Sequence, residues 1–580
     1  MVIPVKQKKT IVFLIASLIL TVLFLCPWLF RDFVGIEHDT YFHLSRIEAF
    51  AEAFFHGDLL PRIYPYENFG YGYASPLFYS DFFLLIPSTL YHFGLPLSFS
   101  YVLMMFLTVY AGNYAMMHAC EKMTGDLPVS ILCASAYCFA NYHVTDIYVR
   151  SAVGESMALV FLPVLLEGLY VLFERRETAG WKAMFIGLAG LLLCHNLSFL
   201  LGALLTALYF LLYLGRMTKK TVIAFFAAGI LAFLCTVFFS LPMIEQLGSQ
   251  KFYLNWYAGG NDLASYAVPL WKYFVNSTVF GYGSTDLPRD MQMTVNIGIF
   301  LSLAPLTVLF TDLKKHSLFT ILCFLVGYLC FILPWDIFPW QKMSVFSILQ
   351  FPWRLFAVAM PLLTIAAACG LSALLKGKLI PTVLIFLLVC GEGMYHVLPA
   401  FERTFGIDSH TTYSFLINGG LTDPCYSATY VRIQLAGGEY LPQNSPDFRD
   451  LDPVIRTSEG IPAGIGYDKN RTKLTFHVAE VPEDGELLMP LTWYLGYTVS
   501  GKNGAKAELL PSEEALVSLR IHEPGTYTVR YSGTILQHST AVVSLLAWVL
   551  VIFLFFRREE ITSLPFPLKK DSEKTDSPEE

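Results

Sequence analysis

The stretch IVFLIASLILTVLFLCPWLF, residues 11–30, carries no charged side chain and is long enough as a helix to cross a bilayer. Lys6, Lys8 and Lys9 precede it and no small-residue cleavage site follows, which predicts an uncleaved signal anchor. The chain continues with GIEHDTYFHLSRIEAF, residues 35–50, where acidic, basic and imidazole side chains crowd together. A polar stretch at this position is not typical of an ordinary solvated turn.

The composition of the whole chain agrees with a membrane protein. Of its 580 residues, 55% are hydrophobic and 15% are charged, and the mean hydropathy is +0.53. Soluble domains carry nearer a quarter charged residues. Most of the 11 cysteines lie in apolar runs, and only Cys425 lies in the large polar segment, so no disulfide framework is expected. No basic stripe or zinc-finger spacing indicates nucleic-acid binding.

Repeated apolar runs predict twelve membrane spans, with the lipid bilayer as the first partner. Lys and Arg in short loops mark the cytoplasmic side, and twelve spans place every basic cluster there, together with both termini. The predicted spans are residues 11–30, 98–119, 128–142, 155–173, 183–197, 199–214, 222–244, 296–311, 317–334, 354–374, 379–397 and 539–556. The basic clusters are Lys6–Lys9, Arg175–Lys182, Arg216–Lys220, Lys314–Lys315, Lys376–Lys378 and Arg557–Arg558.

One further apolar run, SPLFYSDFFLLIPSTLYHFG, covers residues 75–94. Counting it as a span would move the later basic loops to the outside. It also contains Asp81, Pro76 and Pro87, so we expect residues 76–92 to form a helix that lies in or dips into the outer interface. An ordinary span, compensated by a miscount elsewhere, is the alternative.

These assignments predict the domain organisation. Residues 1–397 form a transmembrane domain with outer segments 31–97, 143–154, 245–295 and 335–353. Residues 398–538 form an extracytoplasmic β-rich domain, because KLTFHVAEV, ALVSLRIHE and GTYTVRYSG alternate apolar and polar residues. A small β-sandwich is the economical interpretation. Residues 539–556 are the final transmembrane helix, and residues 557–580 are an acidic, disordered cytoplasmic tail.

Polar residues collect in the predicted outer segments. On a helix starting near Glu37, Asp39, His43 and Arg46 occupy positions i, i+4 and i+7 and share one face. Ionisable groups near hydrocarbon are costly unless they are solvated or paired, which favours a functional cluster. A solvated amphipathic surface helix is the alternative interpretation of these residues.

Three other clusters fall on the same predicted face. They contain Arg150 with Glu155, His195 with Asn196, and Arg354 in LQFPWR. Each cluster has a plain structural alternative. Glu155 can interact favourably with a helix dipole while Arg150 anchors the helix, and His195 and Asn196 can bond to backbone carbonyls at a helix end. Arg354 can extend from the membrane boundary toward water. An Arg can also grip a phosphate through its planar fork. Hydrolase, ATPase and zincin motifs are absent from the sequence.

The ordered motifs HDTYFHLSRI, YGYASPLFYSDFFLLIP, YVRSAVGESMALVFLPVLL, CHNLSF, LQFPWRLF and GEYLP extend from about residue 35 to residue 442. They resemble the bacterial family labelled "membrane protein 6-pyruvoyl-tetrahydropterin synthase-related". They are also similar to YfhO-like proteins and, more distantly, to the GT-C superfamily of membrane glycosyltransferases. The pterin label gives no guide to chemistry, because no zinc-binding His triad of a soluble pterin synthase is present.

The GT-C resemblance implies a fold, an activity and site residues. Such enzymes transfer a sugar from a polyprenyl-phosphate carrier to an acceptor on the outer side, and many have an interfacial helix after the first acidic motif. HDTYFHL resembles the Asp-x-Tyr-x-His motif of oligosaccharyltransferases, which implies an acidic catalytic role for Asp39 and a supporting role for His43. A second acidic role falls on Glu155. No Asp-x-Asp pair is present. Whether Asp39 and Glu155 hold a divalent cation (Mg or Mn) is therefore left open by the sequence.

The predicted function is therefore a glycosyltransferase in the bacterial plasma membrane. Asp39 would be the base, and Arg150 or Arg354 the phosphate partner. The acceptor would be an envelope polymer, a glycolipid or a protein. A transporter or flippase for lipid-linked saccharides and a non-catalytic envelope-assembly scaffold are the alternatives. The predicted catalytic residues are Asp39 and Glu155, and the predicted substrate-binding residues are His43, Arg46, Arg150, His195, Asn196 and Arg354.

Overall fold

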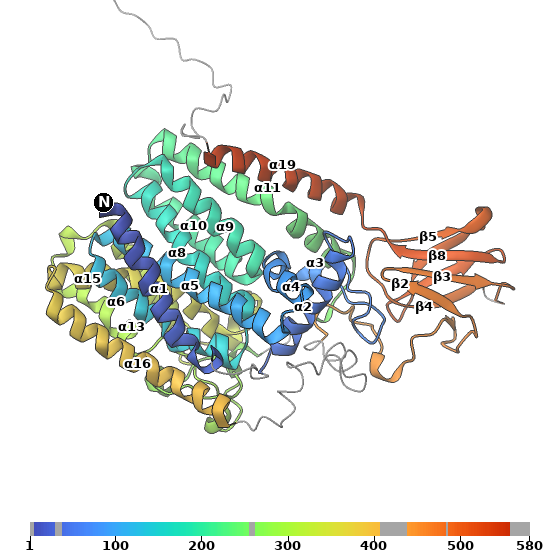
Figure 1. Cartoon of the computed structure of the whole chain (residues 1–580), viewed down its shortest axis with the longest axis horizontal. Coiled ribbons are helices and arrows are strands. Elements are labelled where there is room, and N and C mark those ends of the chain that lie inside the picture. Colours follow the sequence, from blue (N-terminus) through green and yellow to red (C-terminus); the bar gives the residue numbers. More distant parts are fainter. Residues whose placement is uncertain (1–4, 30–36, 255–261, 407–437, 483–484, 557–580) are drawn as a thin grey trace, which may run out of the picture.

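The computed structural model describes residues 5–29, 37–254, 262–406, 438–482 and 485–556. A body of packed helices forms most of the molecule, and two β-sheets extend from one end of it (Figure 1). The predicted acidic tail, residues 557–580, and Cys425 lie outside the described residues.

Eight helices in the described part are long and apolar enough to cross a membrane. They are α1 (Val5–Leu29), α5 (Leu97–Thr124), α8 (Val153–Phe173), α10 (Asn196–Tyr213), α11 (Lys219–Ser249), α15 (Phe356–Leu375), α16 (Leu379–Gly406) and α19 (Ile535–Phe556). The prediction of a multi-pass helical protein is thus confirmed at this level.

The other four predicted spans coincide with shorter apolar helices. These are α6 (Leu127–Cys138), α9 (Trp181–Cys194), α13 (Ile299–Leu303), which continues as a 3-10 helix to Phe310, and α14 (Leu318–Ile332). An ideal helix of this size is shorter than the hydrocarbon thickness unless its flanking residues help to cross it. The count of twelve spans therefore stays a prediction.

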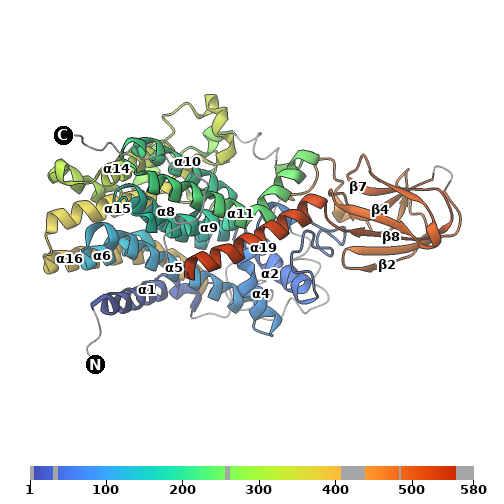
Figure 2. The ribbon, with the colours of Figure 1, turned by 90° about the horizontal axis from the view of Figure 1, so that it is seen from above.

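Three of the described connections that carry basic clusters lie together at one end of the helical body. Lys9 pairs with Glu121 at 2.6 Å, Arg175 donates to the Lys122 carbonyl, and Lys182 donates to the Phe555 carbonyl. Helix α1 begins and α19 ends at this end, whereas the sheets extend from the opposite one (Figures 1 and 2). We call the opposite end the β-side end. Which compartment it faces stays a prediction.

The β-rich region confirms the strand pattern of the sequence. One sheet has the order β1-β4-β7-β6 and the other β2-β3-β8-β5, and every pairing is antiparallel. Leu474 and Val529 from one sheet share a buried core with Leu487 and Leu519 from the other. The strands are β1 (Arg456–Thr457), β2 (Tyr467–Asn470), β3 (Lys473–Val478), β4 (Glu486–Thr492), β5 (Tyr497–Gly501), β6 (Ala507–Pro511), β7 (Leu516–Ile521) and β8 (Gly525–Tyr531).

The segment expected to lie in the interface, residues 76–92, is broken into α3 (Ser75–Phe78), a 3-10 turn (Phe82–Leu84) and α4 (Leu85–His92). None of these pieces is long enough to span a membrane. Helix α4 packs against α2 (Thr40–Phe55) and α5, and Ser88 donates to the Ile47 carbonyl at 2.8 Å. This broken segment, residues 75–92, therefore covers the β-side end of the helical body. We call it the interfacial segment.

Candidate active site

The two polar loops that the sequence placed on one face do meet in the structure. The Asp39 N–H donates to the Arg150 carbonyl at 3.0 Å, and the Thr40 and Ser151 hydroxyls lie 2.7 Å apart. The first loop leads into α2. The second follows α7 (Asn141–Val144) and a π-helical turn (Thr145–Val149), and it leads into α8. Asp39 is thereby fixed beside Arg150.

Arg150 is a buried cation, 6% exposed, that is held between two carboxylates. Its Nη1 donates to Asp146 Oδ1 and, at 2.9 Å, to Glu155 Oε2. The guanidinium also lies over the Trp353 ring, 4.6 Å from its centroid. A buried guanidinium is tolerated when carboxylates and an aromatic face replace its water.

Glu155 lies in the first turn of α8, and both its oxygens are engaged. The Tyr142 hydroxyl donates to Oε1 at 2.5 Å, and Oε2 accepts from Arg150. Arg354 Nε lies 3.6 Å from the same Oε2 atom. Glu155 therefore holds two arginines in place, which fits a positioning role better than a proton-transfer role.

Arg354 lies just before α15, in the 3-10 turn Pro352–Leu355. Its Nη1 donates to Gln350 Oε1 at 2.5 Å and to the Leu349 carbonyl at 3.2 Å. Its buried Nε has no hydrogen-bond partner within the described ranges. The side chain is 12% exposed, so part of the guanidinium fork is available to a ligand.

Asp39 is the carboxylate with the most freedom in this cluster. It precedes α2 at the N-cap position, but its side chain does not cap the helix. It is half-buried, and it makes no ion pair with any side chain that the structure describes. Burial raises the pKa of Asp39 to about 6, although the nearby Arg150 and Arg354 oppose this and Glu155 adds to it. Such a carboxylate is ionised at neutral pH and can accept a proton.

His195 and Asn196 lie at the break between α9 and α10. His195 is the N-cap residue of α10, where its ring Nδ1 accepts from the Ser198 N–H, and its ring centroid lies 6.4 Å from that of Tyr79. Asn196 donates to the Phe78 carbonyl at 2.9 Å. Asn196 thus secures the broken interfacial segment, whereas His195 borders the cluster.

Gly154 allows α8 to approach this break. A Cβ at Gly154 would collide with the Tyr79 hydroxyl and with the Cys194 carbonyl oxygen. Only a glycine therefore lets Glu155 enter the cluster from a helix so close to the α9 end.

His43 and Arg46 belong to a second polar group. Arg46 pairs with Asp81 and donates to the Tyr79 and Ser80 carbonyls, and it lies 3.4 Å from His43 Nδ1. The Tyr64 hydroxyl donates to the other Asp81 oxygen at 2.5 Å. These contacts use the guanidinium inside the protein, where it ties α2 to the interfacial segment.

The expected single face of Asp39, His43 and Arg46 does not form. The prediction started the helix near Glu37, whereas α2 starts at Thr40. Asp39 therefore has non-helical backbone angles, φ −108° and ψ 8°, and the helical spacing does not set where its side chain lies. The Asp39 carbonyl accepts the first bond of the helix, from the His43 N–H at 3.1 Å, so Asp39 precedes the helix.

Three residues of the cluster are not among the predicted site residues. Asp146 and Tyr142 lie in the same quoted stretch as Arg150, and the i,i+4 spacing of Asp146 and Arg150 was a usable signal. Glu439 comes from the GEYLP motif. Burial and, to a smaller extent, Asp39 raise the pKa of Glu439 to about 7, and Arg354 opposes the shift. Glu439 therefore lies near enough to Asp39 and Arg354 for their charges to act on it.

A divalent cation does not fit the residues that were expected to hold it. No group of three or more His, Cys, Asp or Glu side chains with a metal-binding arrangement occurs in the described ranges. Both Glu155 oxygens are already bonded, and Arg150 supplies the positive charge next to Asp39. The carboxylate oxygens of this cluster thus bind guanidinium groups in place of a metal ion.

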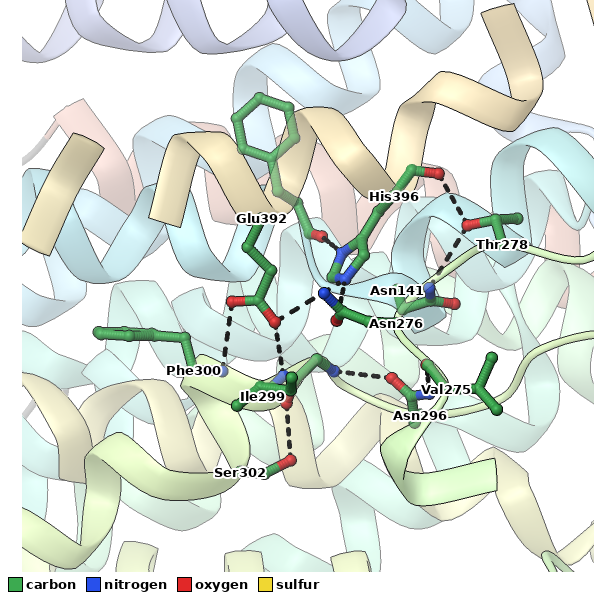
Figure 3. Close-up of polar contacts among 12 residues, drawn as sticks. Asn141, Val275, Asn276, Thr278, Asn296, Ile299, Phe300, Ser302, Glu392 and His396 are labelled. Atoms are coloured by element: carbon green, nitrogen blue, oxygen red, sulfur yellow. Dashed lines mark hydrogen bonds and ion pairs between the residues drawn. The ribbon is translucent and has the colours of Figure 1, made fainter. Parts of the chain in front are cut away.

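A second polar network links α16 to the start of α13 and to the segment that precedes α13 (Figure 3). Glu392 accepts from the Ile299 N–H at 2.6 Å, and His396 Nε2 lies 2.8 Å from Asn276 Oδ1. The segment before α13, residues 270–298, which we call the supported segment, also contacts the cluster. His38 Nε2 donates to the Gly281 carbonyl of this segment at 3.0 Å.

Asn296 is the buried centre of this supported segment, and we expect Asn296→Ala to lower the stability of the protein. Asn296 donates to the Lys272 and Val275 carbonyls and accepts from the Gly298 N–H. Unpaired buried groups cost about 1–3 kcal/mol, so the thermal unfolding temperature in detergent should fall. Asn470→Ala, on an exposed strand position, is the control. Equal unfolding temperatures for both variants would contradict the anchoring role.

The fold and cluster define a multi-pass helical protein with a charged centre at one end of its helices. No family model matches the chain. It is 25% identical over 257 residues to an "Uncharacterized protein" from Lactococcus lactis subsp. cremoris (strain MG1363), a match that covers 42% of this chain. The chain spans about two fifths of that relative's length, 41%. The YfhO-like family named above is not shown by these comparisons.

Among solved structures, the chain is similar to the archaeal oligosaccharyltransferase AglB from Archaeoglobus fulgidus in complex with an inhibitory peptide and a dolichol-phosphate. The identity is 12% and the TM-score is 0.39, with 75% of this chain and 56% of that chain covered. A likeness of this size does not establish a function, so the proposal below rests on the site's own geometry.

Proposed function

We propose that the protein is a membrane glycosyltransferase that moves a sugar from a polyprenyl-phosphate donor to an acceptor at the β-side end. The observation that carries this proposal is the carboxylate of Asp39, which forms no ion pair with the described residues and lies beside two arginines that Glu155 holds in position. A base beside fixed cations is what transfer from a sugar phosphate requires. The β-side end would face outward, with both termini in the cytoplasm of a bacterial cell.

The proposed chemistry is a single displacement. The acceptor hydroxyl gives its proton to Asp39 while its oxygen attacks the anomeric carbon of the donor. The bond from that carbon to the phosphate oxygen breaks, and polyprenyl phosphate leaves with the electron pair. Arg354 and Arg150 stabilise the charge that grows on the phosphate. One displacement inverts the anomeric centre.

The donor's hydrocarbon chain needs an apolar surface near the cluster. A groove of about 300 Å³ lies between α2, the interfacial segment, α11 and α19. Phe50, Phe239 and Trp548 line it, and Ser80 and Asp81 lie at its polar edge. Asp81 is the partner of Arg46, so the groove adjoins the second polar group of the site. A prenyl chain in this groove would place its phosphate toward the β-side end.

The position of the charged groups favours an enzyme over a transporter. Transporters bind their substrates near the middle of the bilayer, between broken helices of paired repeats. Here Asp39 precedes α2, Glu155 lies in the first turn of α8, and Arg354 precedes α15. The groups therefore gather at helix ends, where a lipid phosphate would lie. Sugar transfer from defined polyprenyl-phosphate donors, compared between wild type and Asp39→Asn, tests the proposal.

Arg354→Lys is expected to raise the KM for the donor more than the KM for the acceptor. Lysine keeps the charge but loses the planar fork that binds two phosphate oxygens. Loss of one charge-assisted hydrogen bond, about 1.5–3 kcal/mol, corresponds to roughly tenfold to a hundredfold in donor KM. Steady-state kinetics in proteoliposomes, with each substrate varied in turn, measures this split.

Arg520→Lys provides the matched control for that experiment, because Arg520 lies on the exposed face of β7 and pairs loosely with Glu508 at 3.8 Å. It should leave both KM values unchanged. An equal rise of donor and acceptor KM in Arg354→Lys would argue against a phosphate-binding role for Arg354.

A further inference from the structure

The loop that carries Glu439 is fastened to the segment that follows α11. The Leu254 N–H donates to the Glu439 carbonyl at 2.7 Å, and the Tyr253 N–H donates to the Leu441 carbonyl at 3.0 Å. These bonds fix the loop backbone without using the Glu439 side chain.

The neighbouring residue, Tyr440, locks this loop against the interfacial segment and the β-sheets. Its ring stacks on Phe78, with centroids 5.2 Å apart and planes at 1°, and it lies 6.4 Å from Phe42. The Tyr440 N–H donates to the Tyr73 hydroxyl, and the Tyr494 hydroxyl donates to the Tyr440 carbonyl. Phe42 lies in the same first turn of α2 that follows Asp39. The packing therefore brings Glu439 toward the Asp39 side of the cluster.

The Glu439 carboxylate has no hydrogen bond or ion pair with the residues that the structure describes, although its side chain is half-buried. Partly buried carboxylates without partners are uncommon, and each one calls for an explanation. Asp39 and Arg354 are the charged groups that act on it. Within the described part of the chain, two carboxylates thus lack an ion-pair partner near the partly exposed guanidinium of Arg354.

We propose that Glu439 and Asp39 form an acceptor subsite that binds two hydroxyl groups of a saccharide or polyol. This inference rests on the proposed glycosyl transfer and names its acceptor class. Above about pH 7 both carboxylates are mostly ionised and only accept hydrogen bonds. A matching ligand must then offer donors, and neighbouring hydroxyls offer one to each carboxylate. The hydroxyl on Asp39 loses its proton and attacks the donor sugar. The hydroxyl on Glu439 keeps its proton and orients the acceptor, which makes Glu439 an acceptor-binding residue.

A peptide acceptor fits this arrangement less well. An asparagine amide has two N–H donors, but both lie on one nitrogen, so it reaches two carboxylates only if they flank that single atom. An amide nitrogen is also a weaker acid than a hydroxyl, and a carboxylate is a weak base for it. The low acidity of the amide therefore favours an acceptor with several hydroxyl groups.

Glu439→Gln tests the subsite, because glutamine keeps the size of the side chain and removes its charge. Loss of a hydrogen bond to a charged group should raise the KM for the acceptor about tenfold to a hundredfold. The slow hydrolysis of the donor by water, measured without acceptor, should keep its wild-type rate. Maltotriose serves as the acceptor probe. Asp447→Asn is the control, because Asp447 is exposed and its carboxylate pairs with Arg449 instead of facing the cluster.

Glu439→Asp separates a missing charge from a misfolded loop. Aspartate keeps the carboxylate on a shorter arm, so part of the acceptor affinity should return. An unchanged acceptor KM in Glu439→Gln, with donor hydrolysis intact, would overturn the subsite. Transfer by the wild type to an Asn-x-Thr peptide but not to maltotriose would overturn the acceptor class. If the wild type consumes no lipid-linked donor at all, the proposed glycosyl transfer itself fails.

Discussion

Asp39→Asn is expected to reduce sugar transfer by about 10²–10⁴-fold, the usual contribution of a general base. Asparagine keeps the shape of the side chain, and the Asp39 N–H still reaches the Arg150 carbonyl. The substitution removes only the group that accepts the acceptor proton. The measurement is the initial rate of transfer in proteoliposomes with saturating donor and acceptor.

The pH profile supplies an independent test of this role. Burial raises the pKa of Asp39 from an ordinary 3.8 to about 6, and the base works only when it is ionised. The wild-type rate should therefore be level above about pH 6 and fall about tenfold per pH unit below it. A rate that does not fall below about pH 6, or a fully active Asp39→Asn variant, would show that Asp39 is not the general base.

The stability of Asp39→Asn should separate catalysis from folding. A carboxyl whose pKa is raised in the folded state binds its proton more tightly there than in the unfolded chain. As pH rises through the window from 3.8 to about 6, this carboxyl destabilises the folded protein. At neutral pH, Asp39→Asn should therefore be as stable as the wild type or more stable. Reduced thermal stability would indicate a structural role instead.

Arg150→Gln is expected to destabilise the protein by about 3–5 kcal/mol, because it leaves buried charges without their counter-ion. Arg150 is the shared partner of Asp146 and Glu155. Arg354, at 3.6 Å from Glu155, can compensate only one of these carboxylates. Thermal unfolding in detergent and the yield of monodisperse protein measure the loss.

A second substitution should reverse part of that loss. Adding Asp146→Asn to Arg150→Gln removes one uncompensated carboxylate, so the double variant should be more stable than Arg150→Gln alone. Arg520→Gln is the control, because an exposed pair contributes little, about 0–1 kcal/mol. If Arg150→Gln unfolds at the wild-type temperature, Arg150 does not hold the cluster together.

The sequence was sufficient to predict which polar segments meet. Apolar runs and basic loops place Asp39, Arg150, Glu155 and Arg354 at one membrane face, and the structure brings these four together. The strands of the β-rich region were also predictable. A strand that buries one face has alternating apolar and polar residues, and the sequence shows this alternation. Helix lengths were less predictable, and several expected spans are shorter than a bilayer requires.

The partners of each charge could not be read from the sequence. Arg46 has Asp81 as its partner, 35 residues away, and only the folding of the interfacial segment decides that pairing. Glu439 lies far along the chain from Asp39, inside a long polar segment where many carboxylates looked equivalent. Its place depends on the packing of Tyr440 against Phe78 and on bonds to the segment after α11. Such tertiary contacts leave no periodic signal.

The central claim is that Asp39 and the arginines beside it act on a lipid-borne sugar phosphate. The direct measurement follows the release of polyprenyl phosphate from polyprenyl-phosphate sugars in proteoliposomes that contain wild type, Asp39→Asn or Arg520→Lys. We expect wild type and Arg520→Lys to release the lipid phosphate together with a glycosylated acceptor, and Asp39→Asn to release almost none. Release at the same rate by folded Asp39→Asn, or none by folded wild type across the donor series, would contradict the account.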